Sequence, residues 1–396
     1  MSSVRSSVGS TVETRVLSIV KGFVCAAKKC PHNCCRGWQI PVDEKTEKNF
    51  KEMPGLRGRH LRYFLTSFRG DTVIKKIMGR CPFINSDHLC QFEANGETEL
   101  MPLVCRIYPR EGVRYDDLIE VTLELSCPVA ARLFVENPGR LSFVPHSYIE
   151  PFFAISNEDS GFLSYLLTER EKILDFVWER DFPLADTWKV LYSYISEVMS
   201  LIMRNRLSEA KEVSLDEHLC AFQEKGEEAY LSFFSITTID RMILDHIDYG
   251  ALFIREHVFS DLIKDYNRLF KNMPVNTINR DFHDAVISMC EEVPGLSEKY
   301  RSYFSYNITQ LFLHSYEDYH ILKPFLFSVL YTELLMIFDL TRFLRAKRTV
   351  PVAPPVTKEP SPWHVQIETL YLMESCVRHN PYLTQNLLNV MREETL

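Results

Sequence analysis

The distribution of cysteine constrains this chain more than any other feature of its sequence. Eight of the eleven cysteines fall in the first third of the 396 residues: Cys25, Cys30, Cys34, Cys35, Cys81, Cys90, Cys105 and Cys127. The segment before Arg15 has neither the apolar stretch nor the small-residue cleavage site of a secreted protein. We therefore expect a cytoplasmic protein, and in a reducing compartment thiols grouped this closely more often bind metal or do redox chemistry than form disulfides.

The spacing of these cysteines favours metal binding. Thiolate is a soft ligand that suits iron-sulfur clusters and zinc, and cysteines two to four residues apart can offer two sulfurs to one ion. Neighbouring side chains diverge, so Cys34 and Cys35 are expected to serve different sites, or one of them packs as a small hydrophobe. We expect a subset of the eight cysteines to be ligands, with zinc as the alternative to iron. His32 and His88 could each replace a thiolate, although a lone histidine is more often structural.

The pattern of apolar residues predicts a mostly α-helical protein. After residue 145, helical periodicity and plausible N-caps predict helices at 161–176, 185–205, 215–234, 238–253, 259–272, 282–292, 297–314 and 319–345. The apolar stretch 321–338 is interrupted by two charged residues and a proline, so we expect a buried core helix and no membrane span. These helices make up a helical body at 145–349. A proline-rich loop at 350–362 follows, and then a C-terminal helical pair within 363–396, at 363–377 and 381–393.

The first part of the chain is less regular. We expect a flexible tail at 1–14 and, at 15–144, a small cysteine-rich metal module with one short β-hairpin, packed on the larger all-helical body. The alternating run at 118–125 predicts a strand, with turns at Glu111-Gly112 and Asp116-Asp117. Glu120 and Glu124 then share the face opposite the apolar one, which predicts a solvated strand face.

The charge of the chain argues against a nucleic-acid partner. The net charge is −8, and no basic patch with interleaved aromatic residues is present. A thiol redox protein is also disfavoured, because the sequence contains no C-x-x-C pair. The sequence gives no information on the oligomeric state.

The order of the cysteine motifs resembles that of the flagellin lysine N-methylase family. The matching motifs are C-x4-C-x3-C-C-x-G-W from Cys25, C-P-F at Cys81, the Leu-Cys pair ending at Cys90, C-R-x-Y-P-R from Cys105 and S-C-P-V-A-A around Cys127. They span residues 16–131, and the first of them also resembles a wider class of zinc- or iron-chelating bacterial proteins. The resemblance implies methyl transfer from S-adenosylmethionine to the ε-amine of lysines on flagellin, with an iron-sulfur cluster of the 4Fe-4S type on the cysteine motif. The alternative is a non-enzymatic zinc- or iron-chelating interaction protein with a structural metal.

Such a reaction sets requirements for the site. A lysine ε-ammonium has a pKa of about 10.4 and must lose its proton before it attacks a sulfonium methyl group. The site should therefore desolvate the amine and offer a carboxylate, a tyrosine or a backbone carbonyl to hold it. The candidates are Tyr108, Tyr115, Glu120 and Glu124. Arg106 and Arg110 are candidates for binding the cofactor, because guanidinium groups match carboxylate geometry.

The means of cofactor binding is not specified by a known motif. The sequence has no G-x-G-x-x-G turn, so the doubly wound methyltransferase fold is not expected. The C-x3-C-x2-C spacing of radical enzymes is also missing. The cluster could therefore anchor the cofactor, carry electrons or only brace the fold, and a polar and a radical mechanism both stay open.

Overall fold

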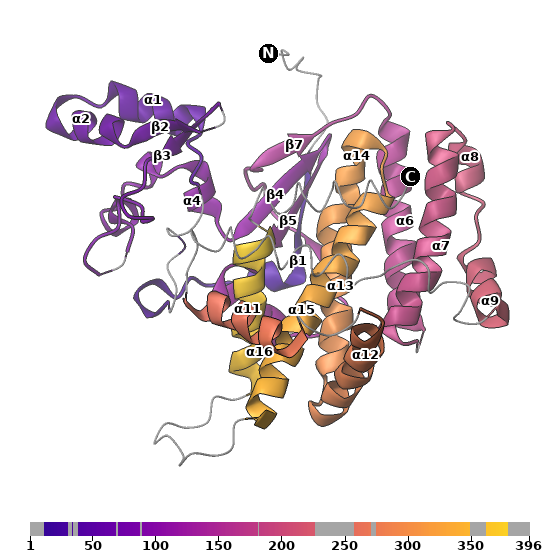
Figure 1. Cartoon of the computed structure of the whole chain (residues 1–396). Coiled ribbons are helices and arrows are strands. Elements are labelled where there is room, and N and C mark those ends of the chain that lie inside the picture. Colours follow the sequence, from indigo (N-terminus) through magenta and orange to yellow (C-terminus); the bar gives the residue numbers. More distant parts are fainter. Residues whose placement is uncertain are drawn as a thin grey trace.

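The computed structural model describes residues 12–30, 34, 39–68, 70–87, 89–180, 182–225, 257–270, 275–348 and 362–378. Within these residues the protein is mostly helical, with a small sheet from the N-terminal region (Figure 1). The prediction of a mostly helical fold is therefore confirmed. The helices predicted at 238–253 and 381–393, and residues 350–361 of the proline-rich loop, lie outside the described residues.

A five-stranded sheet lies beside the long helices. Its order is β6 (Phe143–Pro145), β1 (Glu13–Leu17), β5 (Leu118–Leu123), β4 (Arg110–Tyr115) and β7 (Phe153–Ile155). Strands β4 and β5 form the expected antiparallel hairpin, whereas β1 runs parallel to β5 and β7 runs parallel to β4. The turn at Asp116-Asp117 is confirmed, and Asp116 has the positive φ of 49° that suits a tight turn. The turn predicted at Glu111-Gly112 is wrong, because both residues pair within β4.

Strand β5 is buried on both faces. Every residue from Leu118 to Leu123 is buried, and Glu120 and Glu124 are only 5% and 9% exposed. The prediction of a solvated strand face for these two glutamates is therefore wrong. The physical reason is that helices cover the polar side of the hairpin, and they supply polar partners for the two carboxylates.

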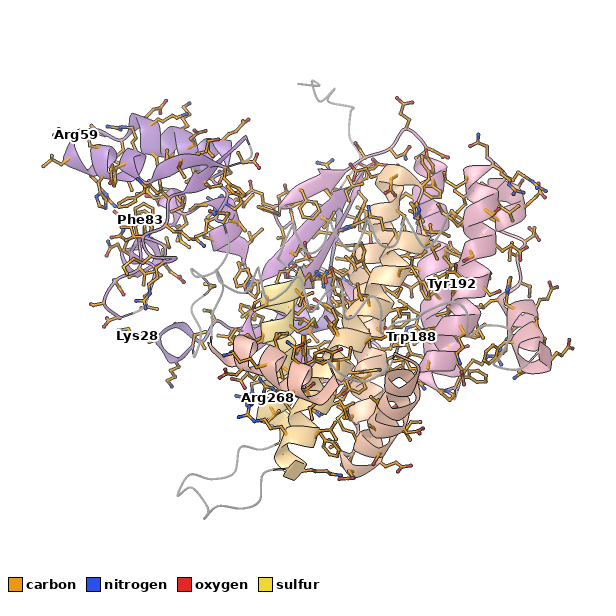
Figure 2. All side chains as sticks on the ribbon, viewed as in Figure 1. Lys28, Arg59, Phe83, Trp188, Tyr192 and Arg268 are labelled. Carbon is orange, nitrogen blue, oxygen red and sulfur yellow. The ribbon has the colours of Figure 1, made fainter. Side chains whose placement is uncertain are left out.

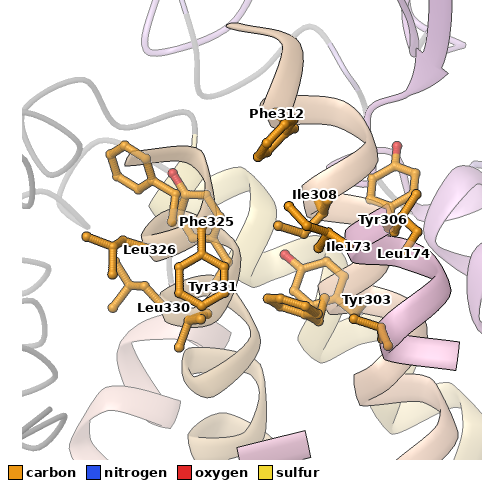
Figure 3. Packing of buried hydrophobic residues seen from close by; sticks show 14 of the residues in the cluster. Ile173, Leu174, Tyr303, Tyr306, Ile308, Phe312, Phe325, Leu326, Leu330 and Tyr331 are labelled. Atoms are coloured by element: carbon orange, nitrogen blue, oxygen red, sulfur yellow. The ribbon is translucent and has the colours of Figure 1, made fainter. Parts of the chain in front are cut away.

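Helices of different lengths form the rest of the main core. They are α5 (Pro128–Glu136), α6 (Ser160–Glu179), α7 (Leu184–Met203), α8 (Leu207–Ala210), α9 (Leu215–Lys225), α11 (His257–Phe270), α12 (Val275–Glu292), α13 (Leu296–Leu311), α14 (Ser315–Asp318), α15 (Leu322–Arg348) and α16 (Pro362–Met373). Short helical turns are η1 (Ser18–Gly22), η2 (Ala27–Lys29), η3 (Thr98–Leu100), η6 (Phe312–His314) and the π-turn η7 (Glu374–Arg378). Side chains of α6, α13 and α15 interdigitate in this core, as Figure 3 shows for Ile173, Ile308 and Phe325.

Helix α15 runs through the middle of this helical body and contacts α7, α11, α12, α13 and α16. Its window Leu322–Lys347 is long and apolar enough to cross a membrane by length and composition, but 94% of it is buried inside the protein. This burial is what the prediction of a core helix requires, because neighbouring helices already cover the apolar surface.

Residues 39–107, here called the cysteine lobe, have a hydrophobic cluster of their own. The lobe contains α1 (Glu44–Glu52), α2 (Gly55–Tyr63), the hairpin β2 (Leu65–Phe68) and β3 (Asp71–Ile74), α3 (Gln91–Ala94) and α4 (Leu103–Ile107). It lies to one side of the sheet in Figure 1, and Phe83, labelled in Figure 2, is buried in it. The ring of Phe83 lies 4.7 Å from that of Phe92 and 5.6 Å from that of Phe64, measured between centroids.

Asp43 links two segments of the cysteine lobe. Its carboxylate caps α1 by accepting hydrogen bonds from the N–H and hydroxyl of Thr46, at 3.0 and 2.9 Å, and it also accepts the N–H of Leu103 at 2.6 Å. Leu103 is the first residue of α4, which carries Cys105. Burial alone would raise the pKa of Asp43, but these hydrogen bonds outweigh it and lower the pKa.

We expect Asp43→Ala to lower the free energy of unfolding by about 1–3 kcal/mol, because a cap and a second hydrogen bond to a charged group are lost together. The pKa of Asp43 is lower in the folded than in the unfolded protein, so its contribution is full above the unfolded pKa of about 4 and is lost as the pH falls through the folded pKa. Urea denaturation at pH 7 and at acidic pH measures both effects. Asp43→Asn, which keeps a capping oxygen, is the matched control and should lose less.

Candidate functional site

Four cysteines from separate segments gather on the cysteine lobe. Burial raises the pKa of the Cys105 thiol well above its usual value, and the negative charges of Cys81, Cys34 and Cys90 raise it further. Burial and, in lesser part, Cys81 also raise the pKa of Cys90. Charges interact strongly only over short distances, so Cys34, Cys81 and Cys90 lie in the neighbourhood of Cys105. We call Cys34, Cys81, Cys90 and Cys105 the thiol cluster.

The local fold explains how Cys81 and Cys90 meet. The backbone between them folds back on itself, with a hydrogen bond from the Gln91 N–H to the Phe83 carbonyl and a bridge between Ile84 and Cys90. The Asn85 side chain holds this turn by accepting the N–H groups of Asp87 and Leu89, both at 3.0 Å. The two cysteines therefore stand at the two ends of one closed loop.

Two further cysteines lie beside the thiol cluster. Cys127 precedes α5, and its pKa is raised to about 11, first by burial and then by the negative charges of Cys30 and Cys34. Cys34 is thus close both to Cys127 and to Cys105. The segment that carries Cys30 is tied to the cysteine lobe by an exposed ion pair from Lys28 to Asp87, 3.1 Å long; Lys28 is labelled in Figure 2.

The remaining predicted ligands are Cys25 and Cys35. Cys25 is exposed, and its sulfur accepts the N–H of Ala27 at 3.4 Å. Cys35 lies outside the described residues, as do His32 and His88. The cysteines of the later part of the chain, Cys220, Cys290 and Cys376, are far from this group in the sequence.

The chemistry of the gathered side chains fits a soft metal, whereas their described positions do not complete a site. The ten cysteines in the described part of the chain are thiols. Among the described residues, no three His, Cys, Asp or Glu side chains lie close enough together to hold a metal ion. Burial raises the pKa of the Cys90, Cys105 and Cys127 thiols, so a metal bound by these three would have to displace their protons.

Tyr108 lies where the thiol cluster meets the sheet. It follows α4, and its hydroxyl is 3.1 Å from the hydroxyl of Ser126. Burial raises the pKa of Tyr108 well above its usual value, and the negative charges of Cys127, Cys34 and Glu124 act in the same direction. Of the four predicted catalytic candidates, the structure therefore brings Tyr108 and Glu124 together beside the thiols.

Glu124 is paired with a second carboxylate, Glu111 of β4. Burial raises the pKa of Glu111 well above its usual value, and the charge of Glu124 and a hydrogen bond between the two carboxyl groups raise it further. The amide nitrogen of Gln310, on α13, donates to Glu111 Oε2 and lies 3.4 Å from Glu124 Oε1. We call Glu111 and Glu124 the carboxylate pair.

Arg378 and Glu374 of η7 complete this polar group. Arg378 Nη1 lies 3.5 Å from Glu374 Oε2 and donates to Asn307 Oδ1 at 3.2 Å. The pKa of Arg378 is raised well above its usual value; burial opposes this shift, but the carboxylates of Glu374, Glu124 and Glu111 outweigh it.

The other two catalytic candidates, Tyr115 and Glu120, lie in a separate buried ion pair. Glu120 accepts hydrogen bonds from Arg170 of α6, at 2.7 and 2.8 Å, and from Arg15 Nε at 2.9 Å. Burial opposes ionisation of Glu120, but Arg170 and Arg15 lower its pKa, while burial and the charge of Glu120 raise the pKa of Tyr115. A carboxylate bound by two guanidinium groups is poorly suited to accept a proton.

The predicted cofactor-binding arginines take different positions. Arg106 Nη2 lies 3.8 Å from the exposed carboxylate of Glu150, which is a weak surface pair. The Arg110 guanidinium lies 5.1 Å from the centroid of the Phe23 ring, within cation-π distance. Their role in cofactor binding stays a prediction.

Sequence reasoning missed Glu111, Gln310 and Arg378. They come from a strand, a helix and a π-turn that lie far apart in the chain, and no local motif connects them. Gln310 and Glu111 are 199 positions apart. Only the folded chain shows that they meet.

Comparison with known proteins relates part of this chain to a flagellar protein and to lysine-N-methylases of Salmonella. The chain is 24% identical over 156 residues to the flagellar biosynthetic protein FliU of Salmonella muenchen, a match that covers 36% of this chain and 92% of that protein. It is 23% identical over 143 residues to the lysine-N-methylases of Salmonella typhimurium and Salmonella choleraesuis, covering 34% of this chain and 36% of each methylase. No protein-family profile and no solved structure matches the chain. The chain is therefore distantly related to lysine-N-methylases over about a third of its length.

Proposed function

We propose that this protein transfers methyl groups from S-adenosylmethionine to the ε-amine of lysines on flagellin. The observation that carries the proposal is the similarity to lysine-N-methylases and to a flagellar protein. The gathering of thiols next to Tyr108 and the carboxylate pair supports it, because soft metal ligands and polar groups that can hold an amine lie in one region. The proposed enzyme is cytoplasmic and has flagellin as its partner, without a role for nucleic acid or a membrane.

The proposed methyl transfer determines which groups the protein must supply. The lone pair of the lysine nitrogen attacks the sulfonium methyl carbon, the carbon-sulfur bond breaks, S-adenosylhomocysteine leaves, and the nitrogen gives up a proton. The chain must therefore desolvate the ammonium group and offer an acceptor for its proton. We assign the positioning of the incoming amine to Tyr108, whose hydroxyl lies 3.1 Å from that of Ser126.

We further propose that a subset of the cysteines, centred on the thiol cluster, holds an iron-sulfur cluster of the 4Fe-4S type, with zinc as the alternative. When bound, such a group supplies an open coordination position that can take the amino and carboxylate groups of the cofactor. Cys81, Cys90 and Cys105 also pack against the hydrophobic cluster of the cysteine lobe. This packing favours a second candidate function, in which the metal only braces the lobe of a non-enzymatic interaction protein.

Methylation of flagellin separates the two functions. Protein purified without oxygen is incubated with flagellin, with and without S-adenosylmethionine, and the flagellin is analysed by mass spectrometry. We expect added methyl groups on lysines only when the cofactor is present, together with an equal amount of S-adenosylhomocysteine. Unmodified flagellin in both samples, from protein shown to contain its metal, would favour the bracing role.

A further inference from the structure

We propose that strand β2 and the basic, partly apolar surface around it bind an extended acidic segment of a protein partner, which adds to β2 as a further strand. Strand β2, helix α2 and the turn 77–80 are here called the docking surface. That the partner is the protein substrate rests on the proposed function. Recognition of an acidic strand rests only on the groups described below.

The first observation is the outer edge of β2. Its partner β3 is hydrogen-bonded on its far side as well, because the Ile74 N–H donates to the Ile40 carbonyl at 2.9 Å and the Thr72 carbonyl accepts the Val42 N–H at 2.8 Å. Thr72 and Ile74 therefore direct their backbone groups away from β2. In an antiparallel pair, the residues opposite them must then direct their own backbone groups away from β3.

Those opposite residues are Ser67 and Leu65 of β2. Within the part of the chain that the structure describes, β3 is the only strand that pairs with β2. The last three residues of β2 are exposed to solvent, so the N–H and carbonyl groups of Leu65 and Ser67 face outward along an accessible edge. An extended peptide can add to a strand edge of this kind through main-chain hydrogen bonds.

The second observation is a local excess of positive charge. Residues 55–80 contain seven lysines and arginines but one acidic residue, a net charge of +6 in a chain whose net charge is −8. Arg59, Lys75 and Arg80 are exposed and have no ion-pair partner among the described residues. Arg59 lies at the outer end of the cysteine lobe (Figure 2). An acidic segment is therefore complementary in charge to the docking surface.

The third observation is exposed apolar surface with a pocket beside it. Leu56, Tyr63 and Met78 are 77%, 65% and 96% exposed. The turn 77–80 closely follows β3, at the end of β3 that lies beside the start of β2. A pocket of about 530 Å³ opens at this turn and is lined by Ile77, Met78, Arg80 and Cys81. The docking surface therefore leads to a pocket that borders the thiol cluster.

The outward backbone groups favour a protein over the other partners of a basic surface. An anionic membrane or a nucleic acid would be attracted by the positive charge, but neither has backbone amides that could pair with Leu65 and Ser67. An acidic segment of a protein matches the strand edge and the charge together.

Fluorescence polarisation of two labelled peptides with the full-length protein tests the docking surface without any catalysis. The probe is the acidic peptide Thr-Val-Glu-Val-Asp-Val-Glu-Thr, and the control peptide has lysine in place of each acidic residue. We expect the acidic peptide to bind at least about tenfold more tightly, and added salt to weaken its binding. Hydrogen exchange in residues 65–68 should become slower when the acidic peptide is bound.

The key variant is Ser67→Pro. It removes the outward N–H, and it leaves the hydrogen bonds between β2 and β3 in place because Ser67 makes none of them. We expect the acidic peptide to bind about threefold to tenfold more weakly, whereas Ser67→Ala, which keeps the N–H, should bind it like the wild type. Arg59→Glu should weaken binding about threefold. Lys211→Glu, at an exposed lysine after α8, should leave binding unchanged.

Three results would overturn the docking surface. They are equal affinity for the two peptides, unchanged affinity in folded Ser67→Pro, and tighter binding of anionic phospholipid vesicles or of polyuridylate than of the acidic peptide, equal in wild type and Ser67→Pro. Dimerisation of the protein that Ser67→Pro abolishes, with no peptide binding, would assign the edge to a second copy of this chain and would also overturn it.

The outcomes are distinguishable from those of the proposed function. If the acidic peptide binds as expected but flagellin is not methylated, the docking surface stands and the methylase proposal fails. If flagellin is methylated while folded Ser67→Pro leaves both the peptide affinity and the KM for flagellin unchanged, the methylase proposal stands and the docking surface fails.

Discussion

Replacing Glu120 by glutamine is expected to lower the free energy of unfolding by about 3–5 kcal/mol. Arg170 is only 1% exposed, and both of its terminal nitrogens donate to the Glu120 carboxylate. The substitution removes the negative charge and leaves a buried guanidinium whose main counter-ion is gone. Urea denaturation of the wild type and the variant at pH 7 measures the difference.

The matched control is Glu136→Gln, which breaks an exposed ion pair with Arg132 and should change stability by less than about 1 kcal/mol. The pH dependence gives a second check. The pKa of Glu120 is lowered in the folded protein, so its contribution is full above the unfolded pKa of about 4 and is lost as the pH falls through the folded pKa. The Glu120→Gln variant should lack this acid-dependent loss. Equal stability of the two variants would contradict the assignment of a stabilising buried ion pair.

The helices of the body could be predicted because each is encoded by its own apolar period. Helix α13, predicted at 297–314, runs over Leu296–Leu311, and α7, predicted at 185–205, runs over Leu184–Met203. Strands β1, β6 and β7 could not be predicted in this way. They are three to five residues long, and β1 is a strand because it pairs with β5, about a hundred residues later. The alternation within residues 118–125 identified β5, but it could not show that helices cover the polar face.

In the candidate site, too, only the residues marked by a local sequence pattern could be predicted. Clustering along the sequence was enough to single out the cysteines, because eight of the eleven fall in the first third of the chain. The choice of ligands among the eight stays a prediction. The carboxylate pair and its contact with Gln310 could not be predicted from the sequence. Glu111 lies in a Glu-Gly dipeptide that suits a turn, and Gln310 lies on a helix face that looks like ordinary core.

Cys105→Ala is expected to abolish stoichiometric metal binding. Among the described cysteines, Cys105 is the one whose pKa is raised by Cys81, Cys34 and Cys90 together, so we take it as the central member of the thiol cluster. Structural metals bind with apparent free energies of about 10–16 kcal/mol shared among a few thiolates, and loss of one thiolate should reduce the affinity by several orders of magnitude. Iron, zinc and acid-labile sulfide are measured on protein purified without oxygen, together with the absorbance of sulfur-to-iron charge transfer.

Cys220→Ala is the matched control, because Cys220 is an exposed thiol on α9, away from the cysteine lobe. It should leave the metal content unchanged. Iron with equal sulfide in the wild type would support the cluster, whereas stoichiometric zinc would support the alternative metal at the same thiols. Full metal content in folded Cys105→Ala would mean that the thiol cluster is ordinary packing of small buried side chains. The metal would then have to be held by other residues, and the link between Tyr108 and a metal centre would be lost.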